Sequence, residues 1–591
     1  MHRFTVWAPN ADRVDIVLKG ERLSMRRVTE DAHDHANRGW WAVEAETGPG
    51  DRYAFSLDGG DPRPDPRSRF QPDGVHGASQ LVGHDAYEWR SESFRAAPLS
   101  AAVIYELHLG TFTAEGTLDA AAKKLDHLVS LGVTHVELMP VNAFDGEHGW
   151  GYDGVCWYAP HRAYTGADGP DALKRFVDAC HEAGLAVVLD VVYNHLGPSG
   201  NYLGEFGPYF TEKYHTPWGA ALNLDGEHSD HVRRHIIDNA LMWLRDYRID
   251  GLRVDAVHAL LDRSTTHLLQ QLRDEVDMLE AETGRPNVLI AESDQNDPRM
   301  TVPRSAHGVG MHAQWSDDFH HALHALVTGE RDGWYYDFGS IGTLAKAIRS
   351  AFVHDGTYST IRGRTHGAAP LGADSSRFLA YIQNHDQIGN RAQGDRINRT
   401  ISLQELKTCA ALTLLSPYVP MLFQGEEWGA STPFQYFSDH QGEGLAEAVR
   451  TGRRNEFKEF GWKPDDVPDP QDVETFRRSK LDWSEVEGGE HADLLKWHRS
   501  LLALRKATPG LSGRPIERTA VTFDEGERWL VMRNGPLAVA CSFAEGPVRA
   551  PAPEGSAILL ASSDECVLDG GRVALPAGGC AVLEAKPDAR R

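Results

Sequence analysis

The chain has 591 residues, of which 41% are hydrophobic and 25% charged, a composition typical of a globular protein with several domains. Its 60 basic and 85 acidic side chains leave a net charge of −25, which would repel a phosphate polymer and argues against nucleic acid as a partner. No apolar run approaches the roughly 18 residues of a transmembrane helix, so association with a membrane is not expected.

The first residues and the cysteines indicate the compartment. Residues 1–7 alternate like a strand and lack the basic and apolar segments of a secretory signal. The six cysteines are scattered and form no Cys-x-x-Cys pair, which is typical of reduced thiols in a chain of this length. We therefore expect a cytoplasmic protein.

Residues 1–90 are expected to form a small N-terminal β-sandwich. Short segments with the alternating pattern of strands occur at 4–7, 14–18, 40–43 and 53–55. A stretch rich in Pro, Arg and Asp at 61–67 follows. This change in composition indicates the approach to a new domain.

Residues 91–490 alternate between short apolar runs and helical patterns. Strands that are almost entirely apolar and separated by helices indicate a parallel sheet, because such strands are covered on both faces. Eight runs of this kind predict a (β/α)8 barrel, the TIM-barrel fold, with loop insertions. The eight runs are 102–109, 133–139, 186–192, 251–255, 288–292, 313–316, 378–383 and 418–424.

Helices are expected within the barrel and after it. The amphipathic pattern at 229–248 predicts a helix with Ser229 as its N-cap. Residues 425–490 are polar and contain Pro and Gly, and we expect a loop-rich insertion there. The C-terminal part, 491–591, is predicted to begin with a helix at 492–505 and to continue as a second β-sandwich. Strands of this sandwich are expected at 529–532, 537–541 and 557–560.

Polar side chains recur where the apolar runs end, which is where barrel enzymes place their active sites. Arg253 and Asp255 close the fourth run, Glu292 closes the fifth, and Asp386 follows the seventh. Carboxylates and an arginine on one rim, without a phosphate loop or a set of metal ligands, suit the hydrolysis of glycosidic bonds. One carboxylate would attack the anomeric carbon, a second would protonate the leaving oxygen, and a third would bind sugar hydroxyls.

Several of these residues also have a plain structural interpretation. An isolated Arg-x-Asp is more often a surface ion pair, and only the ordered set argues for catalysis. Asp190, inside the third run, fits a buried supporting carboxylate better than direct chemistry. His320 and His324 have the spacing of a metal pair on a helix, but no Glu at zinc-protease spacing accompanies them. The acidic stretch 294–297 lacks EF-hand spacing, and we expect neither a metal nor a cofactor.

Four segments resemble, in order, the motif regions of the α-amylase superfamily, glycoside hydrolase family 13. They read DVVYNH at 190–195, GLRVD at 251–255, AES at 291–293 and NHD at 384–386. The resemblance implies that Asp255 is the nucleophile, Glu292 the general acid/base and Asp386 the stabiliser of the transition state. It also implies contacts with the sugar or with the nucleophile for Tyr152, His195, Arg253 and His385.

Longer strings resemble the members of this family that cleave the α-1,4 bond next to the terminal trehalose of maltooligosyltrehalose with retention of configuration. These strings lie at 65–77, 192–202, 291–297 and 383–391. The resemblance implies an oligosaccharide substrate that a maltooligosyltrehalose synthase supplies. His258 matches a contact on the leaving-group side in the superfamily. Positional candidates for recognition of the trehalose unit are Asp294, Asn296 and Trp315.

Two other functions remain open at this point. Branching enzymes resemble this organisation of domains, although their third and fourth motifs usually continue differently from Asp294 and Gln387. A non-catalytic glucan-binding scaffold is the alternative from another class, since the N-terminal module resembles glucan-binding sandwiches. The intact set of Asp255, Glu292 and Asp386 argues against that scaffold.

Overall fold

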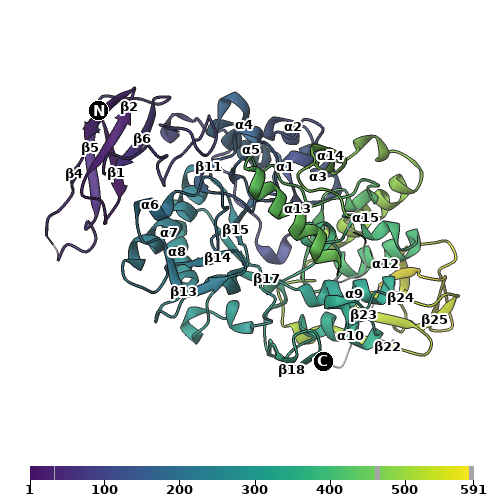
Figure 1. Ribbon diagram of the computed structural model, residues 1–591. Coiled ribbons are helices and arrows are strands. Elements are labelled where there is room, and N and C mark those ends of the chain that lie inside the picture. The colour runs from purple at the N-terminus through teal and green to yellow at the C-terminus, as the bar shows by residue number, and fades with distance from the viewer. Residues whose placement is uncertain (32, 459–462, 464–465, 585–591) are drawn as a thin grey trace.

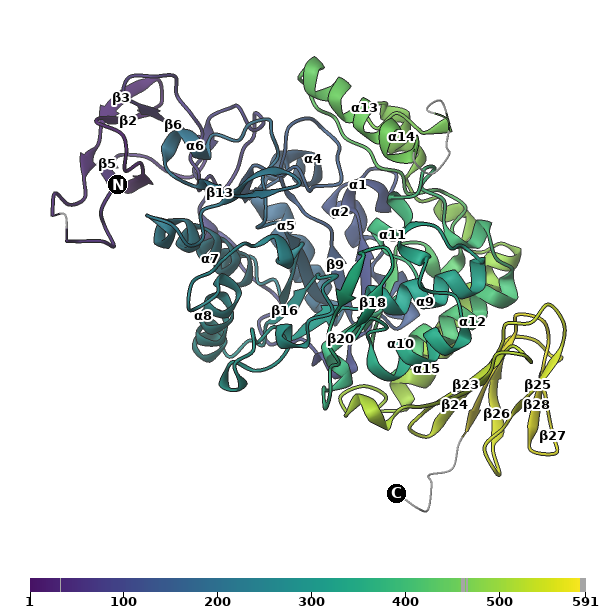
Figure 2. The ribbon, with the colours of Figure 1, turned by 60° about the horizontal axis from the view of Figure 1, so that its bottom comes forward.

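The computed structural model describes residues 1–31, 33–458, 463 and 466–584. Three parts follow one another from end to end: an N-terminal β module, a central barrel and a C-terminal β module (Figure 1; Figure 2). Eight parallel strands close into the barrel. The predicted fold class, a (β/α)8 barrel flanked by two small β domains, is confirmed. Among the described residues, no helix combines the length and the apolar character needed to cross a bilayer.

The N-terminal module contains two small antiparallel sheets with the orders β1-β5-β4 and β3-β2-β6-β7. Their strands are β1 (His2–Trp7), β2 (Val14–Leu18), β3 (Glu21–Ser24), β4 (Arg26–Arg27), β5 (Trp40–Ala45), β6 (Arg52–Leu57) and β7 (Ser79–Gln80). Phe4 and Val6 alternate inward on β1 and are buried in one core with Ile16 and Phe55. The four strands expected in this part are confirmed.

Each of the eight apolar runs contains one barrel strand. The strands are β8 (Ile104–Leu107), β9 (His135–Leu138), β12 (Ala186–Val191), β15 (Gly251–Val254), β16 (Val288–Ala291), β17 (Ala313–Trp315), β20 (Phe378–Ala380) and β21 (Val419–Phe423). They are neighbours in chain order, and β21 pairs with β8 to close the barrel. Nearly every strand residue is buried, which explains why the runs are almost continuously apolar.

Helices and short hairpins connect the strands. The helices are α1 (Leu109–Phe112), α2 (Leu118–Ala122), α3 (Leu125–Leu131), α4 (Arg162–Thr165), α5 (Pro170–Glu182), α6 (Leu203–Phe206), α7 (Ser229–Asp246), α8 (Leu268–Thr283), α9 (Asp317–Thr328), α10 (Ile341–Ser350), α11 (His385–Gly389) and α12 (Leu403–Leu414). The hairpins are β10 (Asn142–Ala143) with β11 (Cys156–Pro160), β13 (Phe210–Thr216) with β14 (Gly219–Leu222), and β18 (Thr357–Ser359) with β19 (Arg364–His366).

Helix α7 corrects one detail of the prediction. Its N-cap is His228 rather than Ser229, and His228 has a left-handed backbone with φ of 64°. Ser229 is already the first helical residue, and its backbone N–H bonds to the carbonyl of Gly226 at 3.2 Å. A side-chain cap is absent at this end, so composition alone placed the N-cap one residue too late.

The segment 425–490 is more ordered than predicted. It contains α13 (Glu443–Lys458) and α14 (Val473–Arg478), which lie side by side over one end of the barrel in Figure 2. Helix α13 includes Gly444 and Gly452, and its polar composition gave no clear apolar stripe. Residues 459–462 and 464–465 of the expected insertion lie outside the described residues.

The C-terminal part begins with α15 (Gly489–Ala507), which is longer than the predicted helix at both ends and packs on α12. Two antiparallel sheets follow, with orders β22-β23-β24-β29-β26 and β25-β28-β27. Their strands are β22 (Ala520–Asp524), β23 (Trp529–Asn534), β24 (Leu537–Ser542), β25 (Val548–Pro551), β26 (Ala557–Ala561), β27 (Val567–Asp569), β28 (Arg572–Leu575) and β29 (Cys580–Glu584). The three strands expected here are confirmed, and the end of the predicted domain, 585–591, lies outside the described residues.

Candidate active site

The carboxyl ends of the barrel strands bring together the charged residues that the sequence singled out. Asp255 directly follows β15, Glu292 directly follows β16, and Asp386 lies in α11, beyond β20. The guanidinium of the buried Arg253 contacts two of these carboxylates. Its Nη1 lies 2.9 Å from Asp255 Oδ1, and its Nη2 lies 3.2 Å from Glu292 Oε2. Asp255 and Glu292, which are 37 positions apart in sequence, therefore meet at one cation.

Asp255 is held by donors on both of its carboxylate oxygens. Arg253 donates to Oδ1, and the side-chain amide of Asn194 donates to Oδ2 at 2.6 Å. Asn194 also donates to the backbone carbonyl of Asp255 at 3.0 Å, which ties the loop after β12 to the end of β15. These contacts fix the orientation of the Asp255 carboxylate.

Glu292 has the properties of a proton donor. Burial raises the pKa of its carboxyl to about 8; the charge of Arg253 opposes this rise, and Asp255 and Asp386 add to it. The backbone N–H of Ala256 donates to Oε2 at 2.5 Å, and Ala256 has a left-handed φ of 39°. At neutral pH the Glu292 side chain therefore keeps its proton.

Asp386 belongs to a chain of hydrogen-bonded groups. Burial pushes the pKa of its carboxyl upward, but the adjacent charge of His385 outweighs burial and lowers the pKa to about 2. Nε2 of His385 lies 3.3 Å from Asp386 Oδ2 and 2.7 Å from the hydroxyl of Tyr152. Tyr152 donates to Asp190 at 2.6 Å, and its ring stacks on that of His385.

Asp190 supports the site from below. It is 1% exposed and accepts from Nη1 of Arg253 at 2.7 Å as well as from Tyr152. Burial raises the pKa of its carboxyl to about 6, although Arg253 opposes the rise. The sequence-based interpretation of Asp190 as a buried supporting carboxylate agrees with this placement.

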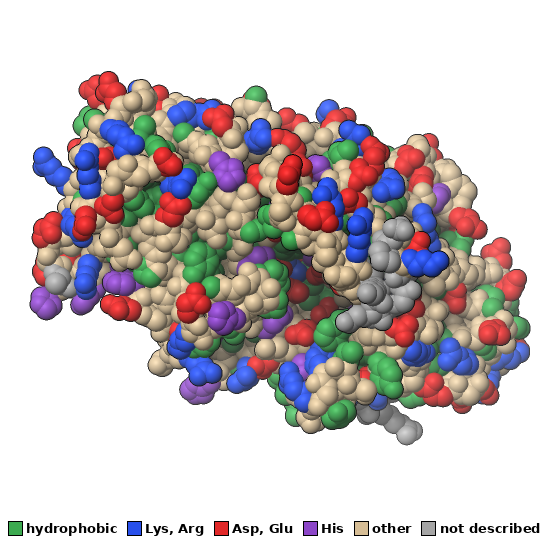
Figure 3. All heavy atoms as spheres, viewed as in Figure 1, with side chains coloured by type: hydrophobic (Ala, Val, Ile, Leu, Met, Phe, Trp, Pro, Cys, Tyr) green, Lys and Arg blue, Asp and Glu red, His purple; other side chains and the backbone are tan. Residues whose placement is uncertain are grey.

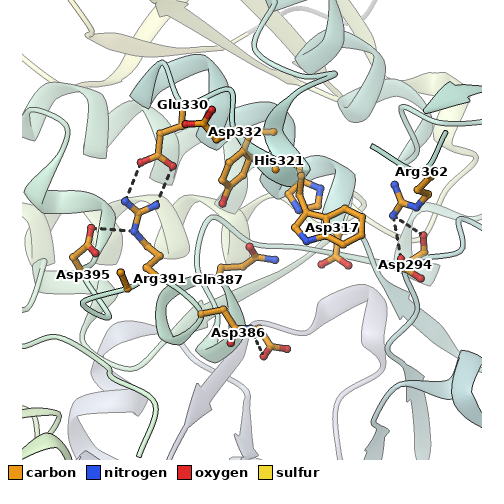
Figure 4. A pocket seen from close by; sticks show the side chains of 15 residues that line it. Asp294, Asp317, His321, Glu330, Asp332, Arg362, Asp386, Gln387, Arg391 and Asp395 are labelled. Carbon is orange, nitrogen blue, oxygen red and sulfur yellow. Dashed lines mark hydrogen bonds and ion pairs between the residues drawn. The ribbon is translucent and has the colours of Figure 1, made fainter. Parts of the chain in front are cut away.

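A cavity of about 510 Å³ opens beside Asp386. Arg362 donates to Asp294 at 3.0 Å and lies over the ring of Trp334 on one wall, and both nitrogens of the Arg391 fork donate to Glu330 at 2.9 Å on the other. Figure 4 shows the Asp294–Arg362 pair and the Glu330–Arg391–Asp395 group on opposite sides, with Asp386 below. The space-filling view has a hollow near the centre of this face, where acidic side chains gather (Figure 3). The cavity has the size of a small-ligand site and is lined by polar groups.

The candidates for the leaving-group side fall into two sets. Asp294 lines the cavity, and Nδ1 of His258 lies 3.9 Å from its Oδ1. Asn296 is instead 4% exposed, and its amide donates to Asp318 and to the carbonyl of His354. The side chain is buried and both N–H groups of its amide are used within the protein, which corrects the expectation of a sugar contact for Asn296.

The expectation that Trp315 recognises the trehalose unit is also wrong. It is 1% exposed and lies under the guanidinium of Arg253, 4.2 Å from its ring centroid. This position supports Arg253 by a cation–π contact and leaves no face for a sugar. His195 lies by contrast at the partly exposed edge of the site, where its ring stacks on the half-exposed Trp218 with centroids 4.5 Å apart.

The histidine pair considered for a metal is occupied by protein groups. His320 contacts the carbonyl of Ile382 and the hydroxyl of Tyr335, and His324 contacts Glu330. Within the described ranges, no group of His, Cys, Asp and Glu has an arrangement that could hold a metal ion.

One charged residue of the site was missed in the sequence. Glu106, in β8, is 1% exposed and accepts from the backbone N–H of His385 at 3.0 Å. Its second oxygen lies 2.5 Å from Nδ1 of His385. The signal was available, because a glutamate inside a strand that is buried on both faces needs a specific partner.

Family models match a segment in each of the three parts of the chain. Residues 1–72 match the family model of carbohydrate-binding module 48, the isoamylase N-terminal domain, and residues 72–217 match the alpha amylase catalytic domain. Residues 516–583 match a domain of unknown function. A crystal structure from Salmonella typhimurium, described as an alpha amylase, superimposes with a TM-score of 0.89 at 39% identity and covers 98% of this chain and 97% of that one.

Relatives that align with nearly the whole chain give a more specific assignment than the family models. The malto-oligosyltrehalose trehalohydrolase of Rhizobium sp. (strain M-11) is 51% identical over 586 residues, which are 98% of this chain and 97% of the relative. The protein of the same name from Arthrobacter ramosus is 52% identical and covers 93% of this chain and 94% of the relative. A 1,4-alpha-glucan branching enzyme from Corynebacterium jeikeium reaches 28% identity over 72% of this chain and 60% of the relative. The chain belongs to the malto-oligosyltrehalose trehalohydrolase family, within the α-amylase class of glycoside hydrolases.

Proposed function

We propose that this chain hydrolyses the α-1,4 bond adjacent to the terminal trehalose of maltooligosyltrehalose and retains the anomeric configuration. The observation that carries the proposal is the contact of Arg253 with both Asp255 and Glu292. Two carboxyls on one guanidinium are close together, as in retaining glycosidases, whose catalytic carboxyls are about 5 Å apart. Inverting enzymes keep them about 6.5–9.5 Å apart, to leave room for water.

In the first half of the reaction Glu292 gives its proton to the glycosidic oxygen while Asp255 attacks the anomeric carbon. Trehalose leaves, and the maltooligosyl chain stays bound covalently to Asp255. In the second half Glu292, now ionised, removes a proton from water, which attacks the same carbon and frees the chain and Asp255. The raised pKa of Glu292 and the donors around Asp255 support these opposite protonation states.

Asp386 stabilises the positive charge that develops on the ring by binding its hydroxyls as an anion. His385 and His195 are assigned to the hydroxyls of the same sugar. Tyr152 is assigned to its face, and Arg253 keeps Asp255 oriented.

The trehalose unit is assigned to the cavity beside Asp386. The two glucose rings of trehalose are joined through both anomeric carbons, so trehalose has no reducing end. The site must therefore distinguish a second ring that is α,α-1,1-linked from one that is α-1,4-linked, as in maltose. The Asp294–Arg362 pair offers acceptors and donors on one wall, with His258 beside Asp294, and the ring of Trp334 offers an apolar face. Rigid polar groups of this kind give large selectivity, because a poorly fitting sugar leaves them unpaired.

The direct test is incubation with maltotriosyltrehalose, with the products followed by NMR. Release of trehalose and of maltotriose that is initially in the α form is expected, and initial β-maltotriose would contradict a retaining mechanism. Long linear amylose distinguishes the alternative of a branching enzyme, since new α-1,6 branches would support that activity and contradict this one. Asp255→Asn provides the inactive control for both substrates.

We also propose a cytoplasmic location and a place after a maltooligosyltrehalose synthase. All six cysteines are free and buried, which suits a reducing compartment. The substrate requires an enzyme that converts the reducing end of a maltooligosaccharide into a trehalose unit. Omission of that synthase from a coupled assay that starts from maltopentaose should abolish the release of trehalose.

A further inference from the structure

Glu106 lies beneath the active site, on the first strand of the barrel, and reaches upward to His385. We propose that Glu106 is a positioning residue of the catalytic centre, which fixes the ring of His385 and keeps it cationic beside Asp386. This inference rests on the proposed function of the same site. It adds a fourth carboxylate, which does not touch the substrate, to the three that do.

The contact between Glu106 and His385 has two points of attachment. One oxygen accepts from the backbone N–H of His385 at 3.0 Å, and the other lies 2.5 Å from Nδ1 of the ring. Both side chains are 1% exposed, so water does not compete for these groups. Because His385 is the first residue of α11, these two contacts fix the start of the helix that carries Asp386.

The other ring nitrogen of His385 also faces acceptors. Nε2 is 2.7 Å from the hydroxyl oxygen of Tyr152 and 3.3 Å from Asp386 Oδ2. The hydroxyl of Tyr152 donates its own proton to Asp190, so it can only accept from His385. Acceptors at both nitrogens favour the doubly protonated imidazolium. Burial alone would lower the pKa of His385, but Asp386 and Glu106 together raise it well above its ordinary value.

A second glutamate beside Glu106 has the opposite character. Glu137 is the register partner of Glu106 on β9 and is also 1% exposed. Neither of its carboxyl oxygens has a hydrogen-bond partner among the described residues. Burial and then the charge of Glu106 raise the pKa of Glu137 well above its ordinary value, so it stays protonated and neutral. The two adjacent glutamates therefore differ in their contacts, since Glu106 bonds to His385 and Glu137 has no such partner.

The charge balance around His385 makes the role of Glu106 measurable. The titratable and charged groups that face this ring or influence it are Glu106, His108, Glu137, Tyr152, Asp190, Arg253 and Asp386. Of the anions among them, Glu106 and Asp386 contact the ring directly. Removal of the charge of Glu106 therefore leaves His385 with one direct counter-ion, and its proton should be lost at a lower pH.

The experiment compares the wild type with Glu106→Gln, Glu106→Asp and Glu137→Gln, using trehalose release from maltotriosyltrehalose between about pH 5 and 9. We expect E106Q to lower kcat/KM about tenfold. In NMR titrations of the His385 ring, the pH at which the ring loses its proton should fall by about one unit in E106Q. E106D keeps the charge and should restore the titration of the His385 ring while kcat stays below that of the wild type. E137Q replaces a neutral acid by a neutral amide and should match the wild type.

Two outcomes would overturn the inference. The first is an E106Q enzyme in which the His385 ring loses its proton at the same pH as in the wild type, because its loss of rate would then come from packing alone. The second is an equal loss in E106Q and E137Q. Thermal unfolding of each variant identifies any that fails to fold. If E106Q fails to fold, E106D is compared with the wild type instead. If the wild type releases no trehalose, the proposed function fails by itself, and the same four proteins are compared on the α-glucan that the wild type does cleave.

Discussion

Asn390 donates its side-chain amide to Asp386 Oδ1 at 3.1 Å, from a position four residues further along the chain. The other oxygen of Asp386 faces His385 at 3.3 Å. The Asp386 side chain is 36% exposed at the mouth of the cavity, so its orientation depends on these two neighbours rather than on close packing. Asn390 and His385 thus hold the carboxylate from opposite sides.

Asn390→Ala should lower kcat/KM about tenfold, because a hydrogen bond to a charged group contributes about 1.5–3 kcal/mol and part of it is replaced by water at an exposed site. Asn390→Asp should be worse than the alanine variant, since it places a second negative charge beside Asp386. The measurement is the initial rate of trehalose release at several substrate concentrations. Equal rates for the wild type and N390A would mean that His385 alone suffices to orient Asp386.

The pKa values around Glu292 predict the pH dependence of the rate. Glu292 must carry a proton for the first step, and its pKa of about 8 means that this proton is present through the neutral range. The rate should therefore hold steady below that value and fall as the pH rises through about 8. The pKa of about 2 for Asp386 predicts that this group causes no loss of rate above about pH 3. If kcat/KM already began to decline with rising pH at a pH well below 7, that result would contradict the assignment of the proton donor to Glu292.

Much of this arrangement could be predicted because it is local in sequence. Asp255 and Glu292 immediately follow apolar runs, and the ends of parallel strands meet on one rim, so their meeting follows from the alternation of strands and helices. Glu106 did not stand out by the same reasoning, because it lies inside a run that was interpreted only as a strand. A buried strand residue that is charged carries as much information as a charged residue at the end of the strand.

The cavity beside Asp386 could not be predicted from periodicity. Its walls come from the loop around Glu330, the turn between β18 and β19 that carries Arg362, and the segment after α11. Loops have no repeating pattern of burial, so the sequence gives no sign of which of their side chains meet. Asn296 illustrates this: it lies only four residues after Glu292, but its backbone has a left-handed φ of 51° and its side chain does not line the cavity.

Asp294→Ala should reduce selectivity for the trehalose unit. Asp294 accepts from Arg362 on the cavity wall, and its loss leaves that guanidinium without its partner where the leaving group is expected. We expect kcat/KM on maltotriosyltrehalose to fall about tenfold more than on maltopentaose, within the range that a polar pocket contributes to discrimination. An equal fall on both substrates would contradict the selectivity role. Asp297→Ala is the matched control, because Asp297 pairs with Arg299 and does not line the cavity.

Glu292→Gln should be more stable than the wild type at slightly alkaline pH although it is inactive. The folded-state pKa of Glu292 is raised from 4.5 to about 8, so folding favours its protonated form. This contribution is fully present below the unfolded pKa, near 4.5, and is lost as the pH rises through about 8. One pKa unit corresponds to about 1.4 kcal/mol, so the loss amounts to a few kcal/mol at most. Glutamine does not ionise, so the free energy of unfolding of E292Q does not fall in this way. The Tm difference between E292Q and the wild type should therefore grow from pH 5 to pH 8. A difference that is constant with pH would show that Glu292 ionises as easily in the folded protein as in the unfolded chain.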